Sequence, residues 1–321
     1  MDDADERFLL RAVELARRSE GHTRPNPPVG AVVVKGGRVV GEGRHRRCGG
    51  DHAEVAAMKN AIRRHGAAVL RGATAYVSLE PCSRPGRVGA CTEALVAAGV
   101  ARVVYACTDP NPANKGRAAR VLSGAGIRCE RAPRESAAAM EGAELLRPFA
   151  KHQATGLPYV TVKIAMSLDG KTCDHSGDAK WVSSATARRR TGLMRSRVDV
   201  MMVGAETVRR DNPSLLCHQA KNDDLFRAIV SGSGRLPPSA QVFTDCAKDR
   251  TLVYRDPVEA VRDLGGRGFL HVLCEGGLKL ARSLAEAGLV DEWITVLASK
   301  VIGSRPIAKA VPIGRTVCIC D

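Results

Sequence analysis

A histidine, a glutamate two residues later and two cysteines further on constrain this chain more than any other feature of its sequence. They are His52, Glu54, Cys82, which follows Pro81, and Cys91. Zn²⁺ favours a tetrahedral shell of imidazole nitrogen and thiolate sulfur, and a catalytic zinc site uses three protein ligands so that water can take the fourth position. We therefore predict that His52, Cys82 and Cys91 bind zinc. A closed structural site is disfavoured because no fourth ligand lies nearby in the sequence.

The order of these residues also indicates a reaction. His-x-Glu followed by Pro-Cys is typical of zinc-dependent nucleobase deaminases, in which the glutamate carries protons without binding the metal. We assign that role to Glu54. Taken singly, each cysteine is better explained as a buried apolar residue and His52 as a hydrogen-bonded polar residue. The joint pattern favours a zinc-dependent hydrolytic site.

The spacing of the two cysteines departs from the usual pattern. Eight residues, Ser83 to Ala90, separate them, whereas deaminases of nucleic acids and nucleosides usually have two. Arg84 and Arg87 make this segment basic. A cationic loop beside the metal suits an anionic substrate.

Composition bounds the class of protein. A chain of 321 residues favours two domains. The net charge of +15 suits phosphorylated metabolites or nucleic acid, but an aromatic content of only 3% argues against a surface on which bases stack. Eleven cysteines without a compact framework favour a reducing compartment. The acidic start and the absence of a long apolar run lead us to expect a cytoplasmic protein with no membrane partner.

Alternating strand and helix patterns predict two α/β domains, residues 1–150 and 151–321. In the first, we predict helices at 6–18, 53–64, 92–98, 117–124 and 135–150, and strands at 29–34, 38–42, 74–79, 100–107 and 127–131. In the second, we predict strands at 159–166, 198–204, 270–273 and 290–299, and a helix at 278–287 that follows a glycine turn at 276–277. The pattern of a Rossmann dinucleotide site does not occur.

Polar residues flanked by prolines recur in the first domain. Asn26 lies between Pro25 and Pro27, and Asp109 and Asn111 alternate with two prolines. Proline fixes the local backbone, so these polar side chains can be held in one place at little entropic cost. An ordinary turn asparagine is an equal alternative for Asn26.

With these motifs, the sequence resembles the bifunctional deaminase/reductase family of riboflavin biosynthesis over nearly its whole length. The first half resembles the diaminohydroxyphosphoribosylaminopyrimidine deaminase, which implies a cytidine-deaminase-like α/β/α fold. The second half resembles the 5-amino-6-(5-phosphoribosylamino)uracil reductase, which implies a dihydrofolate-reductase-like α/β fold. The implied reactions are zinc-dependent hydrolytic deamination of the phosphoribosyl diaminopyrimidinone and then NADPH-dependent reduction of the ribosyl side chain to ribityl.

The resemblance also implies roles for individual residues. For the deaminase, the residues that hold the substrate are Asn26, His45, Arg87, Asp109 and Asn111. For the reductase, the NADPH contacts are Ala165, Trp181, Thr207, Asp211 and Gly277, and the substrate contacts are Arg195, Leu215 and Glu275. We expect a small-molecule phosphoribosyl pyrimidine as substrate, no nucleic-acid partner, and a homo-oligomer.

The chain departs from the family at several positions. Arg84 stands where the family commonly has histidine, and Val88-Gly89-Ala90 replaces Thr-Pro-Pro. In the second half, Ala179 replaces a serine, His218 an arginine that would hold phosphate, and Ser231-Gly232 an Asp-Ser pair, and the chain ends soon after Gly303. A neutral histidine cannot replace the bidentate grip of an arginine. Two alternatives therefore stay open: a deaminase whose second half is a non-catalytic scaffold, and a deaminase of nucleic acid such as tRNA.

Overall fold

The chain folds into two compact units, Met1–Thr155 and Gly156–Asp321. The computed structural model describes residues 1–84, 89–173, 182–217, 222–302 and 315–320, the last of these by their backbone alone. Helix α5 (Ala137–Thr155) runs past the boundary predicted at residue 150, with Pro148 inside it. The helix ends at Thr155, and the next residue, Gly156, has a φ of 71°, the left-handed conformation that commonly follows a helix.

The first unit is built on a five-stranded sheet of order β2-β1-β3-β4-β5. Strand β1 is antiparallel to β2 and β3, whereas β3, β4 and β5 are parallel. The strands are β1 (Gly30–Lys35), β2 (Arg38–Arg44), β3 (Thr74–Leu79), β4 (Arg102–Cys107) and β5 (Arg128–Arg131). The carboxyl ends of β3 and β4 therefore lie side by side, which is where the predicted site residues follow these strands.

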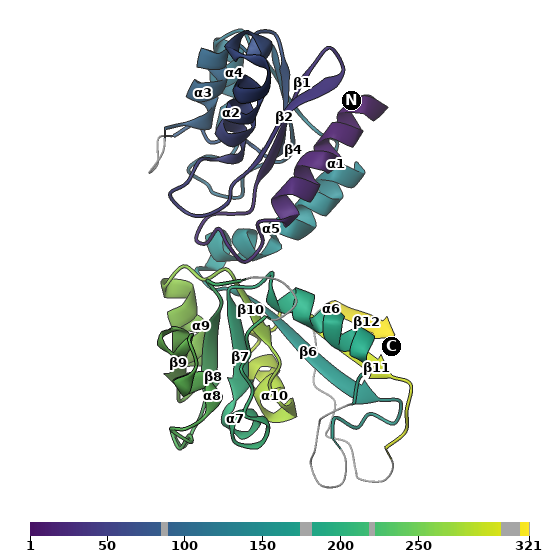
Figure 1. Ribbon diagram of the computed structural model, residues 1–321, viewed down its shortest axis with the longest axis vertical. Helices are drawn as coiled ribbons and strands as arrows, with labels where there is room; N and C mark the ends of the chain where they lie inside the picture. Colours follow the sequence, from purple (N-terminus) through teal and green to yellow (C-terminus); the bar gives the residue numbers. More distant parts are fainter. Residues whose placement is uncertain (85–88, 174–181, 218–221, 303–314, 321) are drawn as a thin grey trace. The chain divides into compact units, whose positions relative to one another are not determined.

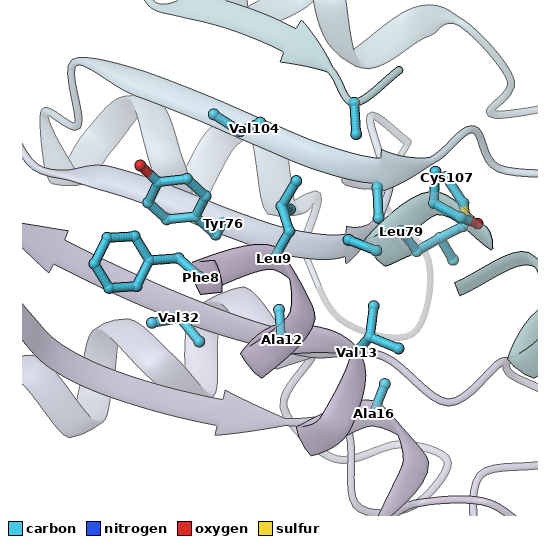
Figure 2. Close-up of a cluster of buried hydrophobic side chains, with 14 of the residues drawn as sticks. Phe8, Leu9, Ala12, Val13, Ala16, Val32, Tyr76, Leu79, Val104 and Cys107 are labelled. Carbon is cyan, nitrogen blue, oxygen red and sulfur yellow. The ribbon is translucent and has the colours of Figure 1, made fainter. Parts of the chain in front are cut away.

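Helices cover both faces of this sheet (Figure 1). Helix α1 (Asp3–Arg17) and α5 pack on one face, and α2 (Ala53–His65), α3 (Cys91–Ala98) and α4 (Arg117–Gly124) pack on the other. Figure 2 shows Leu9, Ala12, Val13 and Ala16, which lie on one side of α1 and face the sheet. Their spacing is that of an amphipathic helix, and it buries one stripe of α1. The predicted α/β/α fold is confirmed.

A buried carboxylate ties α1 to the sheet. Asp5, which is 3% exposed, accepts a hydrogen bond from the hydroxyl of Tyr76 (2.6 Å) and two from the guanidinium of Arg102 (2.7 Å each). The hydrogen bonds from Arg102 hold the pKa of Asp5 below its usual value. Asp5 is therefore a charged anchor within an otherwise apolar contact.

The second unit contains a parallel sheet of order β12-β11-β6-β10-β7-β8-β9 among the described residues (Figure 1). The strands are β6 (Tyr159–Ser167), β7 (Val200–Gly204), β8 (Phe226–Val230), β9 (Thr251–Tyr254), β10 (His271–Cys274), β11 (Glu292–Ala298) and β12 (Arg315–Cys320). After β9 the chain returns to insert β10 between β6 and β7, and β11 then pairs with the other side of β6. Ligands of α/β sheets bind where the strand order reverses in this way.

Helices also pack on both faces of this second sheet. Buried residues of α9 (Pro257–Gly266) and α10 (Leu278–Glu286) share one core cluster with the strands. Residues of α6 (Ala185–Arg195), α7 (Ala205–Asp211) and α8 (Gln241–Thr244) belong to the cluster on the other face. The prediction of a second α/β fold is confirmed.

Among the cysteines whose side chains are described, none forms a disulfide. Within the same part of the chain, no helix combines the length and the apolar character that crossing a bilayer requires.

Candidate active sites

Three separate elements bring the predicted zinc ligands together. His52 is the N-cap of α2, Cys91 is the first residue of α3, and Cys82 follows the end of β3. Nδ1 of His52 lies 3.1 Å from Sγ of Cys91 and 3.5 Å from Sγ of Cys82. The three ligand atoms all lie within 4.8 Å of one another. This donor set of one imidazole and two thiols fits Zn²⁺ with one coordination position left for water.

The backbone of α3 fixes Cys82. The N–H of Cys91 donates to Sγ of Cys82 (3.3 Å), and the N–H of Thr92 donates to the carbonyl of Cys82 (3.1 Å). The hydrogen bond from the Cys91 thiol, together with the nearby His52, lowers the pKa of Cys82 well below its usual value, and the same thiol contact raises the pKa of Cys91. The thiolate of Cys82 is thus stabilised beside the N-terminus of α3, where the helix dipole favours negative charge.

Glu54 lies within the first turn of α2 and is only 4% exposed. Burial, followed by the charge of Cys82, raises the pKa of Glu54 to about 7. A carboxyl group with such a pKa can both accept and release a proton near neutral pH.

His45 connects another predicted residue to the triad. Its Nδ1 donates to the carbonyl of Asp51 (3.0 Å), which leaves Nε2 to accept from Nδ2 of Asn26 (3.1 Å). The rings of His45 and His52 meet edge to face with centroids 5.3 Å apart. Burial lowers the pKa of His45, so the neutral form required by this hydrogen-bond pattern is favoured.

Asp109 and Asn111 follow β4 beside the end of β3. Oδ1 of Asp109 accepts from the N–H of Asn111 (2.8 Å), and Oδ1 of Asn111 accepts from the N–H of Ala113 (3.0 Å). These side chains therefore shape their own loop. Burial raises the pKa of Asp109. Arg87, the remaining predicted contact of the deaminase, lies outside the described residues.

The predicted contacts of the second unit gather at the carboxyl ends of β6, β10 and β7, which are neighbours in the sheet. Ala165 lies near the end of β6, Thr207 in the first turn of α7, and Gly277 at the N-cap of α10. A Cβ on Gly277 would meet no heavy atom within 4 Å, so this helix start is open to an anionic group such as a phosphate of NADPH. Asp211 is the exposed last residue of α7, and Trp181 lies outside the described residues.

Arg195 and Glu275 form a partly buried ion pair near this edge of the sheet. Nε and Nη2 of Arg195 donate to the two carboxylate oxygens of Glu275 at 2.8 and 3.0 Å. Nζ of Lys163 lies 3.8 Å from Oε2 of Glu275. Lys163 was not predicted, although a lysine within the apolar strand β6 is a signal that could have indicated it.

Leu215 adopts a strained backbone conformation with φ of 59° and is 2% exposed. The preceding carbonyl, that of Ser214, accepts a hydrogen bond from Nη1 of Arg227 (3.0 Å). Arg227 is fully buried in β8 and forms two further hydrogen bonds with the carboxylate of Asp245, at 2.6 and 2.9 Å. Sequence reasoning missed this pair, and the signal was again a cation within an apolar strand.

Two of the sequence departures cannot be placed in the fold. Ala179 and His218 lie outside the described residues. Ser231 follows β8 and is buried, and its hydroxyl has no hydrogen-bond partner among the described residues.

Comparison with known families divides the chain in the same manner. The cytidine and deoxycytidylate deaminase zinc-binding region matches residues 2–107, and the RibD C-terminal domain matches residues 158–313. The first match contains His52, Cys82 and Cys91, and the second contains Glu275 with the neighbouring Arg195 and Lys163.

Relatives match across both units. The riboflavin biosynthesis protein RibD of Escherichia coli is 36% identical, with 94% of this chain and 89% of that protein covered. The same protein of Aquifex aeolicus is 32% identical, with 94% and 88% covered.

Solved structures show the same similarity. The structure of Acinetobacter baumannii RibD has a TM-score of 0.82 at 35% identity. That of a diaminohydroxyphosphoribosylaminopyrimidine deaminase/5-amino-6-(5-phosphoribosylamino)uracil reductase from Thermotoga maritima has a TM-score of 0.84 at 33% identity. Each comparison covers 94% of this chain and 88% of the other. From the sequence identity over both units, the chain belongs to the family of the riboflavin biosynthesis protein RibD.

Proposed function

We propose that this protein catalyses two steps of riboflavin biosynthesis. The first is the hydrolytic deamination of 2,5-diamino-6-(5-phosphoribosylamino)pyrimidin-4(3H)-one, and the second is the reduction of the ribosyl side chain of the product by NADPH. The observation that carries the proposal is the convergence of His52, Cys82 and Cys91 in a chain whose second half matches the RibD C-terminal domain.

In the first unit, His52, Cys82 and Cys91 would hold zinc, which supplies the Lewis acid that activates water for attack on the amidine carbon. Glu54 takes up a proton from the attacking water and delivers it to the departing amine, so that ammonia leaves. Its raised pKa suits both transfers near neutral pH. Asn26 and His45 would orient the pyrimidine through the hydrogen-bonded pair that they form beside His52.

In the second unit, NADPH supplies the hydride, and the chain supplies the binding and orientation. The open N-terminus of α10 and the first turn of α7, which contains Thr207, would hold the cofactor. The ion pair of Arg195 with Glu275, and Leu215, would border the sugar phosphate. Because Glu275 is held between two cations, its carboxylate is fixed before the substrate arrives.

Incubation of the purified protein with the phosphoribosyl diaminopyrimidinone, with and without NADPH, tests both steps by mass spectrometry. We expect the mass change of deamination without NADPH and the addition of two hydrogens when NADPH is present. Deamination without NADPH oxidation would instead support the scaffold alternative for the second unit.

The nucleic-acid alternative is tested separately. Filter binding with tRNA measures affinity over a range of salt concentrations, and tight binding with a steep salt slope would contradict a small-molecule substrate. A cytoplasmic location and a homo-oligomer stay predictions. Sedimentation velocity at several protein concentrations tests the second of these.

A further inference from the structure

Asn114 lies in the loop between β4 and α4 and is 5% exposed. Its Oδ1 accepts hydrogen bonds from the backbone N–H of Ser83 (2.7 Å) and from the hydroxyl of Ser83 (3.0 Å). Its Nδ2 donates to Oδ2 of Asp109 (2.9 Å) and, at a longer distance of 3.5 Å, to the carbonyl of Pro81. A single buried amide thus uses its full hydrogen-bonding capacity.

The hydrogen-bond partners of Asn114 lie beside the predicted zinc site and in the predicted substrate site. Pro81 and Ser83 are the residues on either side of Cys82, and Asp109 is a predicted substrate contact. Helix α3 fixes Cys82 from one side through Cys91 and Thr92. The amide of Asn114, which lies in the loop after β4 that also contains Asp109, holds the same segment through Ser83 and Pro81.

Glu80 supports this arrangement in a different way. Its carboxylate accepts from the backbone N–H groups of Asp109 (3.2 Å), Gly116 (3.0 Å) and Ala118 (3.1 Å). It therefore holds the backbone of the loop, whereas Asn114 is the residue that contacts the Asp109 carboxylate and the Cys82 segment together.

We propose that Asn114 is a positioning residue that couples the Cys82 side of the metal site to the Asp109 side of the substrate site. The oxygen end of its amide positions the metal ligand through the two hydrogen bonds from Ser83, and the nitrogen end chiefly orients the Asp109 carboxylate, with only a long contact to Pro81. This inference rests on the proposed deaminase function. Groups that orient metal ligands typically change metal affinity by about 10–100-fold when removed.

Two substitutions separate the two ends of the amide. Asn114→Asp keeps an acceptor for Ser83 but places an oxygen against Asp109. We expect zinc affinity within threefold of the parent and a deaminase KM raised at least tenfold with little change in kcat. Asn114→Leu removes both ends, and we expect zinc affinity to fall by about 10–100-fold together with the rise in KM. Zinc affinity is measured by competition with a chelating dye, and the absorption spectrum of the Co²⁺-loaded protein reports on the ligand geometry.

Asn60 provides a control in the same unit. It is half-buried on α2, and its Oδ1 accepts from the backbone N–H of Glu42 (3.2 Å). Asn60→Leu should leave zinc affinity and deaminase KM unchanged, which excludes a general effect of losing an asparagine amide in this unit. Hydrogen exchange of peptides from α1 should match the parent in both Asn114 variants and serves as the test that the first unit is folded.

Different results would overturn the role of Asn114 and the proposed deaminase. Zinc affinity and KM within twofold of the parent in Asn114→Leu would overturn the inference. Equal changes of both quantities in the two Asn114 variants would also overturn it, because the two ends would then have no separate roles. If Asn114→Leu does not fold, Asn114→Asp still tests the separation of KM from zinc affinity. A parent protein that binds no zinc would overturn the proposed deaminase itself.

Discussion

Arg195 and Glu275 meet through two parallel hydrogen bonds, Nε to Oε1 at 2.8 Å and Nη2 to Oε2 at 3.0 Å. Burial raises the pKa of Glu275, but the charge and hydrogen bonds of Arg195, with those of Lys163, outweigh this effect and hold the pKa below its usual value. Glu275 is therefore ionised at neutral pH, and its orientation depends on the planar guanidinium.

Arg195→Lys tests that dependence. Lysine keeps the charge but cannot form both hydrogen bonds in one plane. Loss of a hydrogen bond between charged groups costs about 1.5–3 kcal/mol, so the reductase kcat/KM should fall by roughly 10–100-fold. Deaminase activity of the same protein is the control, and it should not change. A reductase kcat/KM within twofold of the parent would show that the fork has no role.

Cys82→Ser tests the zinc assignment. We expect about one zinc ion per chain in the parent, measured by elemental analysis, because three ligands and an open position define one catalytic site. Most of this zinc should be lost in the variant, since serine is a poor ligand in a site built from thiolate and imidazole. Cys107→Ser is a useful control, because Cys107 is buried but lies outside the triad. Zinc content unchanged in Cys82→Ser would refute the assignment.

Glu54→Gln tests the proton carrier. The amide fills nearly the same buried volume but cannot carry a proton, so zinc content should be retained while deaminase kcat falls by about 10²–10⁴-fold. Zinc analysis and steady-state deamination on the same preparation check this. Full activity would remove Glu54 from the mechanism.

Asp245→Asn tests the ion pair of Arg227 with Asp245, in which Arg227 also donates to the carbonyl of Ser214, the residue before Leu215. The variant leaves the fully buried Arg227 without its carboxylate, and breaking a buried pair costs about 3–5 kcal/mol. We expect the lower end of this range because the Asp245 side chain is 14% exposed. Both tryptophans of the chain, Trp181 and Trp293, belong to the second unit, so tryptophan fluorescence during urea unfolding reports on that unit.

The control for Asp245→Asn is the exposed ion pair of Arg282 with Glu286, whose side chains are 55% and 52% exposed. Glu286→Gln should change the free energy of unfolding by less than about 1 kcal/mol. Similar losses in the two variants would contradict a special role for the buried pair.

Asp5 predicts how the stability of the first unit depends on pH. Its folded pKa lies below the value of an unfolded carboxyl, about 3.9. The stabilisation is therefore fully present above about pH 4 and is lost as the pH falls through the lower, folded pKa. Asp5→Asn removes this contribution, so the parent should be more stable than the variant at neutral pH, and the difference should shrink below about pH 4.

Hydrogen exchange of peptides from α1 measures the Asp5 effect, with parent and variant compared at the same pH so that intrinsic exchange rates cancel. A difference in protection that stays constant from pH 7 to pH 3 would contradict the assigned ionisation of Asp5.

Periodicity predicts the first unit well because its elements are amphipathic and have clear ends. The predicted bounds of β3 and α4 coincide with those observed, and α1 differs by a few residues. In the second unit, α6 was missed because its arginine-rich sequence has few apolar residues. Helix α9 was also missed, although Asp256 and Pro257 form a recognisable start, with the Asp256 side chain accepting from two N–H groups of the first turn.

Some residues of the candidate sites can likewise be predicted from the sequence, and others cannot. The clustering of His52, Cys82 and Cys91 can be predicted because motif spacing fixes these residues at the starts of helices and after a strand. Asn114 and Arg227 cannot, since an asparagine in a loop and an arginine in a strand acquire a role only through partners that the fold brings to them. Asn114 contacts Ser83, which precedes it by thirty-one positions, and no local pattern encodes that contact.

The segment between Cys82 and Cys91 leaves from beside a strand and returns at the first residue of a helix, and the hydrogen bond from Thr92 to the carbonyl of Cys82 joins its two ends. Because Cys82 is held by the start of α3 and, through Ser83, by Asn114, we expect residues 84–90 to be exchangeable without moving either sulfur as long as Ser83 is kept. Enzyme engineering could therefore exchange this segment as a cassette, giving the same hydrolytic centre a new choice of pyrimidine.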